Sequence, residues 1–175
     1  MFEELGDRLD KAIGKIKGFL QEHNCKFSIY GPDYKGRYEQ VSALIRENGV
    51  DDVVSLHHEI FDEKKEETLL NADCFIQTSR FEGMPMGILE ALSYGIPCLI
   101  TTGTTLEKTI KESGAGWVCD TTADAIAQTI IRAVTERETL KDKSYKARKL
   151  IADKFAWDNV AKQTINKYKL LLDKL

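Results

Sequence analysis

The stretch "SRFEGMPMGILEALSYGIPCLITT" (Ser79–Thr102) decides the fold of this chain. The run just before it, "DCFIQT", is apolar and short, as expected of a buried strand. A helix is predicted from Met86 to Tyr94. Gly95 and Pro97 end it, because glycine suits the left-handed position after a helix and proline cannot continue one. The apolar run "PCLITT" predicts another strand, so the stretch forms a strand–helix–strand unit.

The rest of the chain continues this alternation of strands and helices. Before residue 86 the predicted order is helix 2–22, strand "KFSIYG", helix "YEQVSALIREN", strand "DVVSLH", helix "EKKEETLLNA" and strand "DCFIQT". After "PCLITT" come helix "LEKTIKESG", strand "GWVCD" and three helices near 122–136, 138–153 and 157–174. Short, unbroken apolar strands between helices predict a parallel sheet covered on both faces. We therefore expect one α/β domain over residues 1–175, with a doubly wound, Rossmann-like parallel sheet of about five strands and helices on both faces.

The first predicted element is a helix, directly after Met1. Doubly wound domains usually open with a strand instead. We therefore expect that this chain has been cut from a larger, two-domain protein.

The bulk composition favours a soluble protein that does not bind nucleic acid. The 175 residues carry a net charge of −3, and no long basic stripe offers a surface to phosphates. No secretory signal or membrane-spanning apolar run is present, so a cytoplasmic protein is expected. The four cysteines have no metal-binding or redox spacing and are expected to be buried, reduced thiols: Cys25, Cys74, Cys98 and Cys119.

The start of the helix near Pro85 or Met86 has the features of an anion site. Ligands of open α/β sheets lie beyond the carboxyl ends of the strands, where helices begin. We expect the N–H groups of Gly87, Ile88 and Leu89 to be unpaired there, at the positive end of the helix dipole. Gly83 and Gly87 would let an anion approach the backbone closely.

Two carboxylates flank this expected anion site. Glu82 lies in the loop before the helix and Glu90 lies one turn inside it, with seven residues between them. A carboxylate repels phosphate but accepts strong hydrogen bonds from sugar hydroxyls. A ligand made of a sugar, phosphates and a second sugar would satisfy both carboxylates and the anion site. A nucleotide sugar has this order of groups. The alternative is that Glu82 is an ordinary loop residue and Glu90 an exposed residue that gains only from the helix dipole.

The same stretch resembles the signature of family 4 glycosyltransferases, in which Glu-Gly-(Phe or Met)-Pro precedes Leu-Glu-Ala and Gly-x-Pro. Further segments are similar to that family in the right order: "FSIYGPD", "LLNADCFIQTS", "TTLEKTIKESGAGWVCD" and "FAWDNVAKQTINKYKLLL". The resemblance implies the C-terminal, donor-binding half of an enzyme of GT-B architecture. Such enzymes retain the anomeric configuration and need no metal. The expected donor is a nucleotide-diphosphate sugar, with no other cofactor.

The resemblance also implies roles for single residues. Glu82, the catalytic candidate, would contact hydroxyls of the donor hexose, and Glu90 would contact the ribose. Gly31 would border the diphosphate, and His58, within the segment His57–Ile60, would face the base. The loop and helix start would line the sugar and hold the phosphates through Gly83, Met84, Pro85, Met86, Gly87, Ile88 and Leu89. No metal ligands are expected, since neighbouring His57 and His58 point to opposite faces of a strand.

Some features depart from the family pattern. Its members carry an Arg and a Lys on and just after a first strand, which is missing here, so "GDRLDKAIGKI" is not given that role. His58 stands where many members have Gly, and Thr104 and Thr105 replace a frequent Gly-Gly pair. The N-terminal acceptor domain cannot lie in this chain, so the fragment alone is expected to be inactive.

The expected parent enzyme transfers a hexosyl unit to a saccharide or lipid-linked acceptor in surface glycan synthesis. Peripheral association of that parent with the inner face of a membrane would fit such an acceptor. Two alternatives stay open: a non-catalytic module that binds a nucleotide or sugar phosphate, and a GT-B-like nucleotide-sugar epimerase or phosphorylase.

Overall fold

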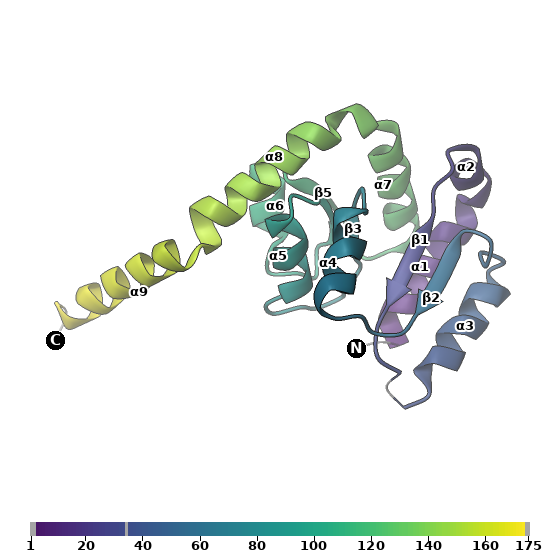
Figure 1. The fold of residues 1–175 in the computed structure, drawn as a ribbon, viewed down its shortest axis with the longest axis horizontal. Coiled ribbons are helices and arrows are strands. Elements are labelled where there is room, and N and C mark those ends of the chain that lie inside the picture. Colours follow the sequence, from purple (N-terminus) through teal and green to yellow (C-terminus); the bar gives the residue numbers. More distant parts are fainter. Residues whose placement is uncertain (1–2, 34, 174–175) are drawn as a thin grey trace.

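The computed structural model describes the backbone of residues 3–33 and 35–173, with side chains from residue 8 onwards. Within this part, strands and helices alternate in the predicted order (Figure 1). The strands are β1 (Phe27–Tyr30), β2 (Val54–His57), β3 (Phe75–Gln77), β4 (Cys98–Thr101) and β5 (Gly116–Cys119). The helices are α1 (Glu3–Lys15), α2 (Lys17–Glu22), α3 (Arg37–Glu47), α4 (Asp62–Leu70), α5 (Met86–Ser93), α6 (Glu107–Ser113), α7 (Ala123–Thr135), α8 (Leu140–Leu150) and α9 (Trp157–Leu172). Residues 2 and 174, the outer limits of the first and last predicted helices, lie outside the described residues.

All strand pairs described are parallel, which confirms the predicted doubly wound α/β class. The strands nevertheless form two sheets, not one. β1 pairs with β2, and a second sheet has the order β3-β4-β5. In the described part of the chain, β1 and β3 therefore each keep one edge without a partner strand.

Helices cover both faces of the strands, as the unbroken apolar runs predicted. Along β4, Leu99 packs into a core with Ile13 and Trp117, on the side of α1 and α7. Its neighbours Cys98 and Ile100 pack into a second core, on the side of α5, α6 and α8. Successive side chains of a strand point to opposite faces, so a strand buried on both sides must be apolar throughout.

The predicted helix 2–22 is interrupted at Ile16. Ile16 has φ −117° and ψ 15°, which separates α1 from α2. Gly14 and Gly18 lie two residues on either side, and glycine weakens a helix because it loses more backbone freedom on folding. Both helices still bury part of the predicted apolar face, since Ile13 and Leu20 are fully buried. The apolar spacing is therefore confirmed, although the helix is interrupted.

The predicted end of α5 is confirmed. Gly95 has φ +78°, in the left-handed region. A side chain there would also collide with Arg148, because an added Cβ would lie 2.4 Å from its Nε. Glycine therefore meets both the conformational and the steric requirement.

The cysteines are all free thiols. Cys98 is buried, which confirms its prediction, whereas the other three residues are half-buried. Burial raises the pKa of Cys74 to about 12 and that of Cys98 well above its ordinary value. Although Cys74 is only half-buried as a residue, its thiol faces the core around Leu99 and is shielded from water.

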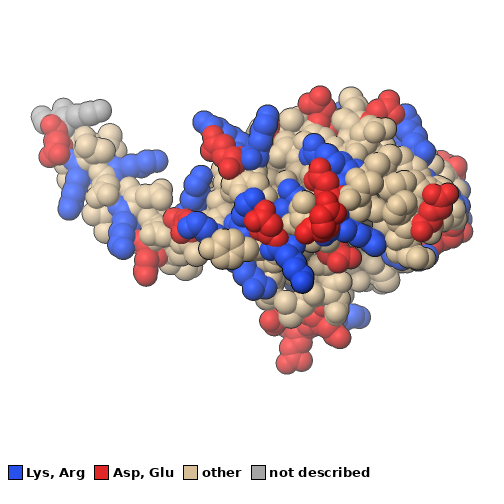
Figure 2. Space-filling view, turned by 90° about the horizontal axis from the view of Figure 1, so that it is seen from above, with Lys and Arg blue, Asp and Glu red and all other residues tan. Residues whose placement is uncertain are grey.

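Helix α9 extends away from the body of the domain (Figure 1). Its large apolar side chains are exposed, with Trp157 at 86% and Tyr168 at 63%. On the face shown in Figure 2, positive and negative side chains are interspersed without a continuous basic band. Among the described residues, no helix combines the length and the apolar character that crossing a membrane requires.

Candidate functional site

The loop after β3 is held in place by the loop after β4. The Thr101 hydroxyl donates to the carbonyl of Ser79 at 2.6 Å. Further along, the Glu82 N–H donates to Gly103 O at 2.8 Å and the Thr105 N–H donates to Glu82 O at 3.2 Å. These bonds form an isolated parallel bridge between the two loops, so the backbone at Glu82 is fixed by a segment some twenty residues later.

The Glu82 side chain has its own partner. The amide of Gln77, the last residue of β3, donates to Glu82 Oε2 at 3.3 Å and contacts Ser79 Oγ at the same distance. The carboxylate is half-buried and lies at the carboxyl end of β3, as predicted. Gln77 was not foreseen as a site residue, because nothing in the local spacing connects it with Glu82.

The start of α5 differs from the prediction. Pro85 caps the helix, and its carbonyl accepts the N–H groups of Ile88 at 3.1 Å and Leu89 at 3.3 Å. The expectation that these two amides are unpaired is therefore wrong. The cause is that Pro85 stands one position before the helix, so its carbonyl already begins the helical ladder.

The unpaired helix start lies one residue earlier than expected. Among the described hydrogen bonds, the N–H groups of Met86 and Gly87 have no acceptor. The prediction that the Gly87 N–H is unpaired is therefore confirmed. The Met86 N–H, which was not predicted to be unpaired, has no acceptor among these bonds either. With eight residues, α5 still has an aligned dipole whose positive end meets these amides.

The surroundings of these amides are open on one side and packed on the other. Gly83 is exposed, and the side chains of Met84 and Met86 are 61% and 66% exposed. Pro85 is buried. At Gly87, an added Cβ would lie 3.2 Å from Cζ of Phe75 in β3, so glycine lets the helix pack closely on the strand.

Glu90 lies one turn inside α5 and forms an ion pair with Lys65 of α4. Lys65 Nζ is 2.6 Å from Glu90 Oε2, and the Glu90 side chain is 35% exposed. The ion pair joins α4, which follows β2, to α5. Lys65 is a second residue missed from the sequence, where the charged run of α4 was expected to be only a solvated face.

Gly31 and His58 lie at the ends of β1 and β2, in the other sheet. The His58 ring stacks on Tyr38 at 4.6 Å, and the His57 ring stacks on Tyr30 at 4.7 Å. The two imidazoles thus pack on different aromatic rings. No contact described for His58 reaches Glu82 or Glu90, so its role at the base stays a prediction.

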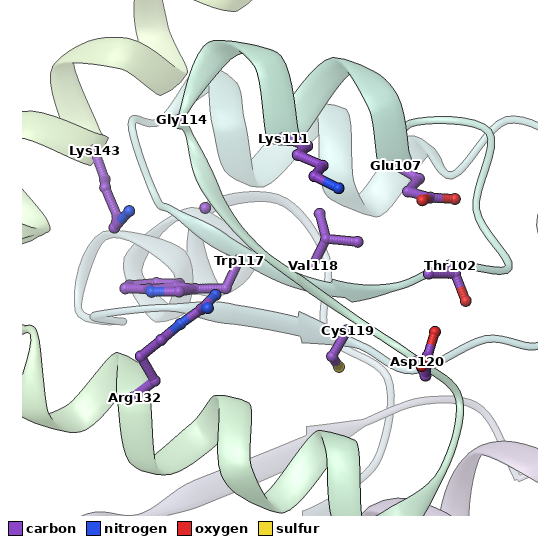
Figure 3. A pocket seen from close by; sticks show the side chains of 11 residues that line it. Thr102, Glu107, Lys111, Gly114, Trp117, Val118, Cys119, Asp120, Arg132 and Lys143 are labelled. Carbon is purple, nitrogen blue, oxygen red and sulfur yellow. The ribbon is translucent and has the colours of Figure 1, made fainter.

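A pocket of about 590 Å³ lies elsewhere, along the outer edge of β5 (Figure 3). Its lining mixes charges of both signs around Trp117: Glu107, Lys111, Asp120, Arg132 and Lys143. The Trp117 indole N–H donates to Glu136 at 2.9 Å, and Lys143 Nζ lies 4.6 Å from its ring centre. None of the predicted site residues lines it, so the two glutamates and the α5 start remain the candidate site.

Known proteins are similar to this chain in sequence and in fold. Residues 7–150 match the family described as glycosyl transferases group 1. An uncharacterized glycosyltransferase of Methanocaldococcus jannaschii is 28% identical over 169 residues, which are 94% of this chain and 41% of that protein. The O-antigen chain mannosyltransferase B of Escherichia coli is 38% identical over 106 residues, 57% of this chain and 26% of that protein.

Solved structures agree. WaaG, a glycosyltransferase involved in lipopolysaccharide biosynthesis, gives a TM-score of 0.73 at 22% identity, covering 86% of this chain and 39% of WaaG. Anabaena HepE in complex with UDP gives 0.76 at 13% identity, covering 92% of this chain and 44% of HepE. The chain spans less than half the length of these relatives. The fold is that of GT-B glycosyltransferases, and the chain belongs to the glycosyl transferases group 1 family.

Proposed function

We propose that this chain is the donor-binding half of a retaining, metal-independent glycosyltransferase that uses a nucleotide-diphosphate sugar. The proposal rests on the start of α5, where the N–H groups of Met86 and Gly87 are unpaired. Along the chain, a half-buried glutamate lies before this pair of amides and another lies after it. Anabaena HepE, a neighbour of the same fold, was solved with UDP and with UDP-glucose, which supports a donor of this class.

The diphosphate would lie against the amides of Met86 and Gly87. Breakage of the glycosidic bond leaves negative charge on the departing diphosphate. N–H donors fixed in advance, together with the positive end of the α5 dipole, would stabilise that charge as it develops. Hydrogen-bond donors placed in this way typically stabilise the charge of a transition state by several kcal/mol where water is excluded.

The two carboxylates would bind the two sugars that flank the diphosphate. Glu82, oriented by Gln77, would accept hydrogen bonds from hydroxyls of the donor hexose. Glu90, held by Lys65, would accept them from the ribose. Gly31 and the segment His57–Ile60 would complete the diphosphate and base contacts from the ends of β1 and β2.

Acceptor binding belongs to the rest of the parent enzyme. We propose a saccharide or lipid-linked acceptor in surface glycan synthesis, bound by an N-terminal domain. The relative named O-antigen chain mannosyltransferase B, and WaaG, described as involved in lipopolysaccharide biosynthesis, support this class of acceptor. A cytoplasmic enzyme that associates peripherally with the inner face of the membrane would fit it.

The test measures binding of UDP, GDP and ADP to this chain by calorimetry, and then compares variants with the nucleotide that binds best. In Glu90→Ala, loss of charge-assisted hydrogen bonds to the ribose should raise Kd by roughly tenfold to a hundredfold, since each such bond contributes about 1.5–3 kcal/mol. Glu138→Ala removes the same charge from an exposed position and should leave Kd unchanged. Equal Kd values for both variants would remove Glu90 from the site.

A further inference from the structure

Strand β5 is at one edge of its sheet. Among the described residues, no strand pairs with its outer side. The Thr102 N–H, just after β4, donates to Cys119 O at 2.9 Å, so the backbone of Cys119 faces β4. The backbone groups of successive strand residues point alternately to the two edges. The N–H and C=O groups of Gly116 and Val118 therefore point to the outer edge.

This outer edge lies at the bottom of the pocket of about 590 Å³ (the β5 pocket), which Gly116 and Val118 both line. Helix α6 forms one wall, and α7 and α8 form the other (Figure 3). A helix is about 10 Å wide, whereas neighbouring strands lie only about 4.8 Å apart. A second sheet with its own covering helices would meet these walls, but a single extended strand can reach the edge between them.

The end of the β5 pocket near the start of β5 is basic. Lys143 Nζ lies 4.6 Å from the ring centre of Trp117. Arg132 Nε lies 3.9 Å from a carboxylate oxygen of Glu136, which also accepts the indole N–H of Trp117 at 2.9 Å. One carboxylate therefore faces two cations, and positive charge remains at this end.

The opposite end of the β5 pocket is acidic. Asp120 directly follows β5 and is exposed, and Glu107 is the first residue of α6. Because α6 returns the chain from the end of β4 to the start of β5, Lys111 lies about 6 Å closer to the basic end than Glu107 does. Figure 3 shows this order along β5. The pocket is thus positive toward the start of the strand and negative toward its end.

We propose that the β5 pocket binds an extended segment of a partner polypeptide, which adds one strand to the outer edge of β5. Gly116 and Val118 would supply the main-chain hydrogen bonds that give strand addition its affinity. The charges would fix the register, with an acidic group of the partner near Trp117 and a Lys or Arg near Asp120. None of the predicted donor-site residues lines this pocket, so the proposal goes beyond the proposed function.

The dimensions of the pocket set the length and direction of the segment. From Gly116 to Asp120 the strand covers roughly 13 Å at about 3.3 Å per residue, so the two charged residues of the partner lie four positions apart. Antiparallel pairing is slightly more stable than parallel pairing, which puts the basic residue first. The walls are built from the stems of long side chains such as Lys111 and Arg132, and these stems suit apolar, β-branched residues between the charges.

Charged residues also occur beside edge strands to prevent aggregation, and this role is the alternative. Such protection needs only charge near the edge. Here the charges surround a hollow within the range of about 300–1,000 Å³ that is typical of ligand sites, and the two signs lie at different ends of it. These two features favour recognition of a polypeptide over protection alone.

The experiment titrates the chain with two acetylated, amidated peptides of the same composition, Lys-Val-Thr-Val-Glu and the charge-reversed Glu-Val-Thr-Val-Lys, and follows amide shifts and hydrogen exchange by NMR. At saturation the first peptide should slow exchange at Gly116 and Val118 at least fivefold. The amides of Trp117 and Cys119, which face β4, should change less. The reversed peptide should bind at least fivefold more weakly, because both of its charges meet like charges.

A pair of variants tests the charges of the protein. Lys111→Ala should raise the Kd for the first peptide roughly threefold, because the acidic group of the peptide loses a cation. Lys108→Ala is the matched control. Lys108 lies in the same helix, its side chain is 85% exposed, and it does not line the pocket, so its loss should leave Kd unchanged.

Three results would overturn the proposal. The first is equal Kd values for the two peptides. The second is slowed exchange at Gly116 and Val118 without peptide that grows with protein concentration, which would make a second copy of the chain the occupant. The third is no change at these two amides at millimolar peptide, which would leave the charges as protection of the edge.

Discussion

Replacing Gly103 by alanine should separate the two loops that fix Glu82. An added Cβ would lie 2.0 Å from Arg80 O, 2.3 Å from Arg80 C and 2.6 Å from Ser79 O. All three are backbone atoms, which cannot rotate away as the end of a side chain can. The only relief is movement of one loop away from the other.

The size of the movement follows from these distances. Ordinary contact with a Cβ begins near 3.4 Å, so the loops must move apart by about 1.4 Å. That displacement breaks the hydrogen bond from Glu82 N to Gly103 O, now 2.8 Å, and strains the one from Thr105 N to Glu82 O. Overpacking costs about 1–3 kcal/mol and a lost hydrogen bond about 1 kcal/mol. We expect a total loss of roughly 2–4 kcal/mol in unfolding free energy.

Thermal unfolding measures this loss. For a domain of this size, 1 kcal/mol corresponds to about 2–4 °C, so Tm should fall by roughly 5–15 °C. Gly83→Ala is the matched control: it lies in the same pair of loops, but an added Cβ has no atom within 4 Å. It should stay within about 0.5 kcal/mol of the parent. Equal stability of the two variants would show that the loops are not clamped together at Gly103.

Two other predictions concern ionisable groups. Lys65→Met should raise the Kd for the best-bound nucleotide up to about fivefold, as expected for a partly exposed ion pair, because Glu90 loses the ammonium that orients it. In calorimetry the double variant Lys65→Met/Glu90→Ala should bind the nucleotide no more weakly than Glu90→Ala alone. Additive losses in binding free energy would contradict the view that Lys65 acts through Glu90. The thiol of Cys74 has its pKa raised by burial from 9.0 to about 12, so the folded chain holds this proton longer than the unfolded chain. Stability should therefore be fully present below pH 9 and fall as the pH rises toward 12, by up to about 1.4 kcal/mol per pH unit from this thiol. Urea unfolding across that range should show a shallower decline in Cys74→Ala, and identical declines would mean that the thiol is not buried.

The order of elements could be read from the sequence because each depends on a local pattern. The unbroken run at Cys98–Thr101 predicted burial on both faces, and its residues do divide between two cores. One sheet of about five strands was predicted, whereas the described strands form two sheets. The break at Ile16 was missed, because apolar spacing continued across it and only the backbone at Gly14 and Gly18 favoured an interruption.

The site was only partly predictable. The sequence placed Glu82 in the loop and Glu90 inside the helix, since both lie within one continuous segment. It misplaced the first unpaired amide by one residue, because the amides were counted from Gly87, whereas Met86 is the first helical residue and Pro85 the cap. Lys65 was missed because only a tertiary contact brings it to Glu90, and Gln77 because no sequence pattern shows that the loop after β3 turns Glu82 back to the end of that strand.

The two carboxylates are held by different parts of the fold. Glu82 depends on the register of β3 and β4, through Gln77 and the bridge to Thr104. Glu90 depends on α4, through Lys65. A change in α4 should therefore disturb the ribose end of the proposed donor site more than the hexose end.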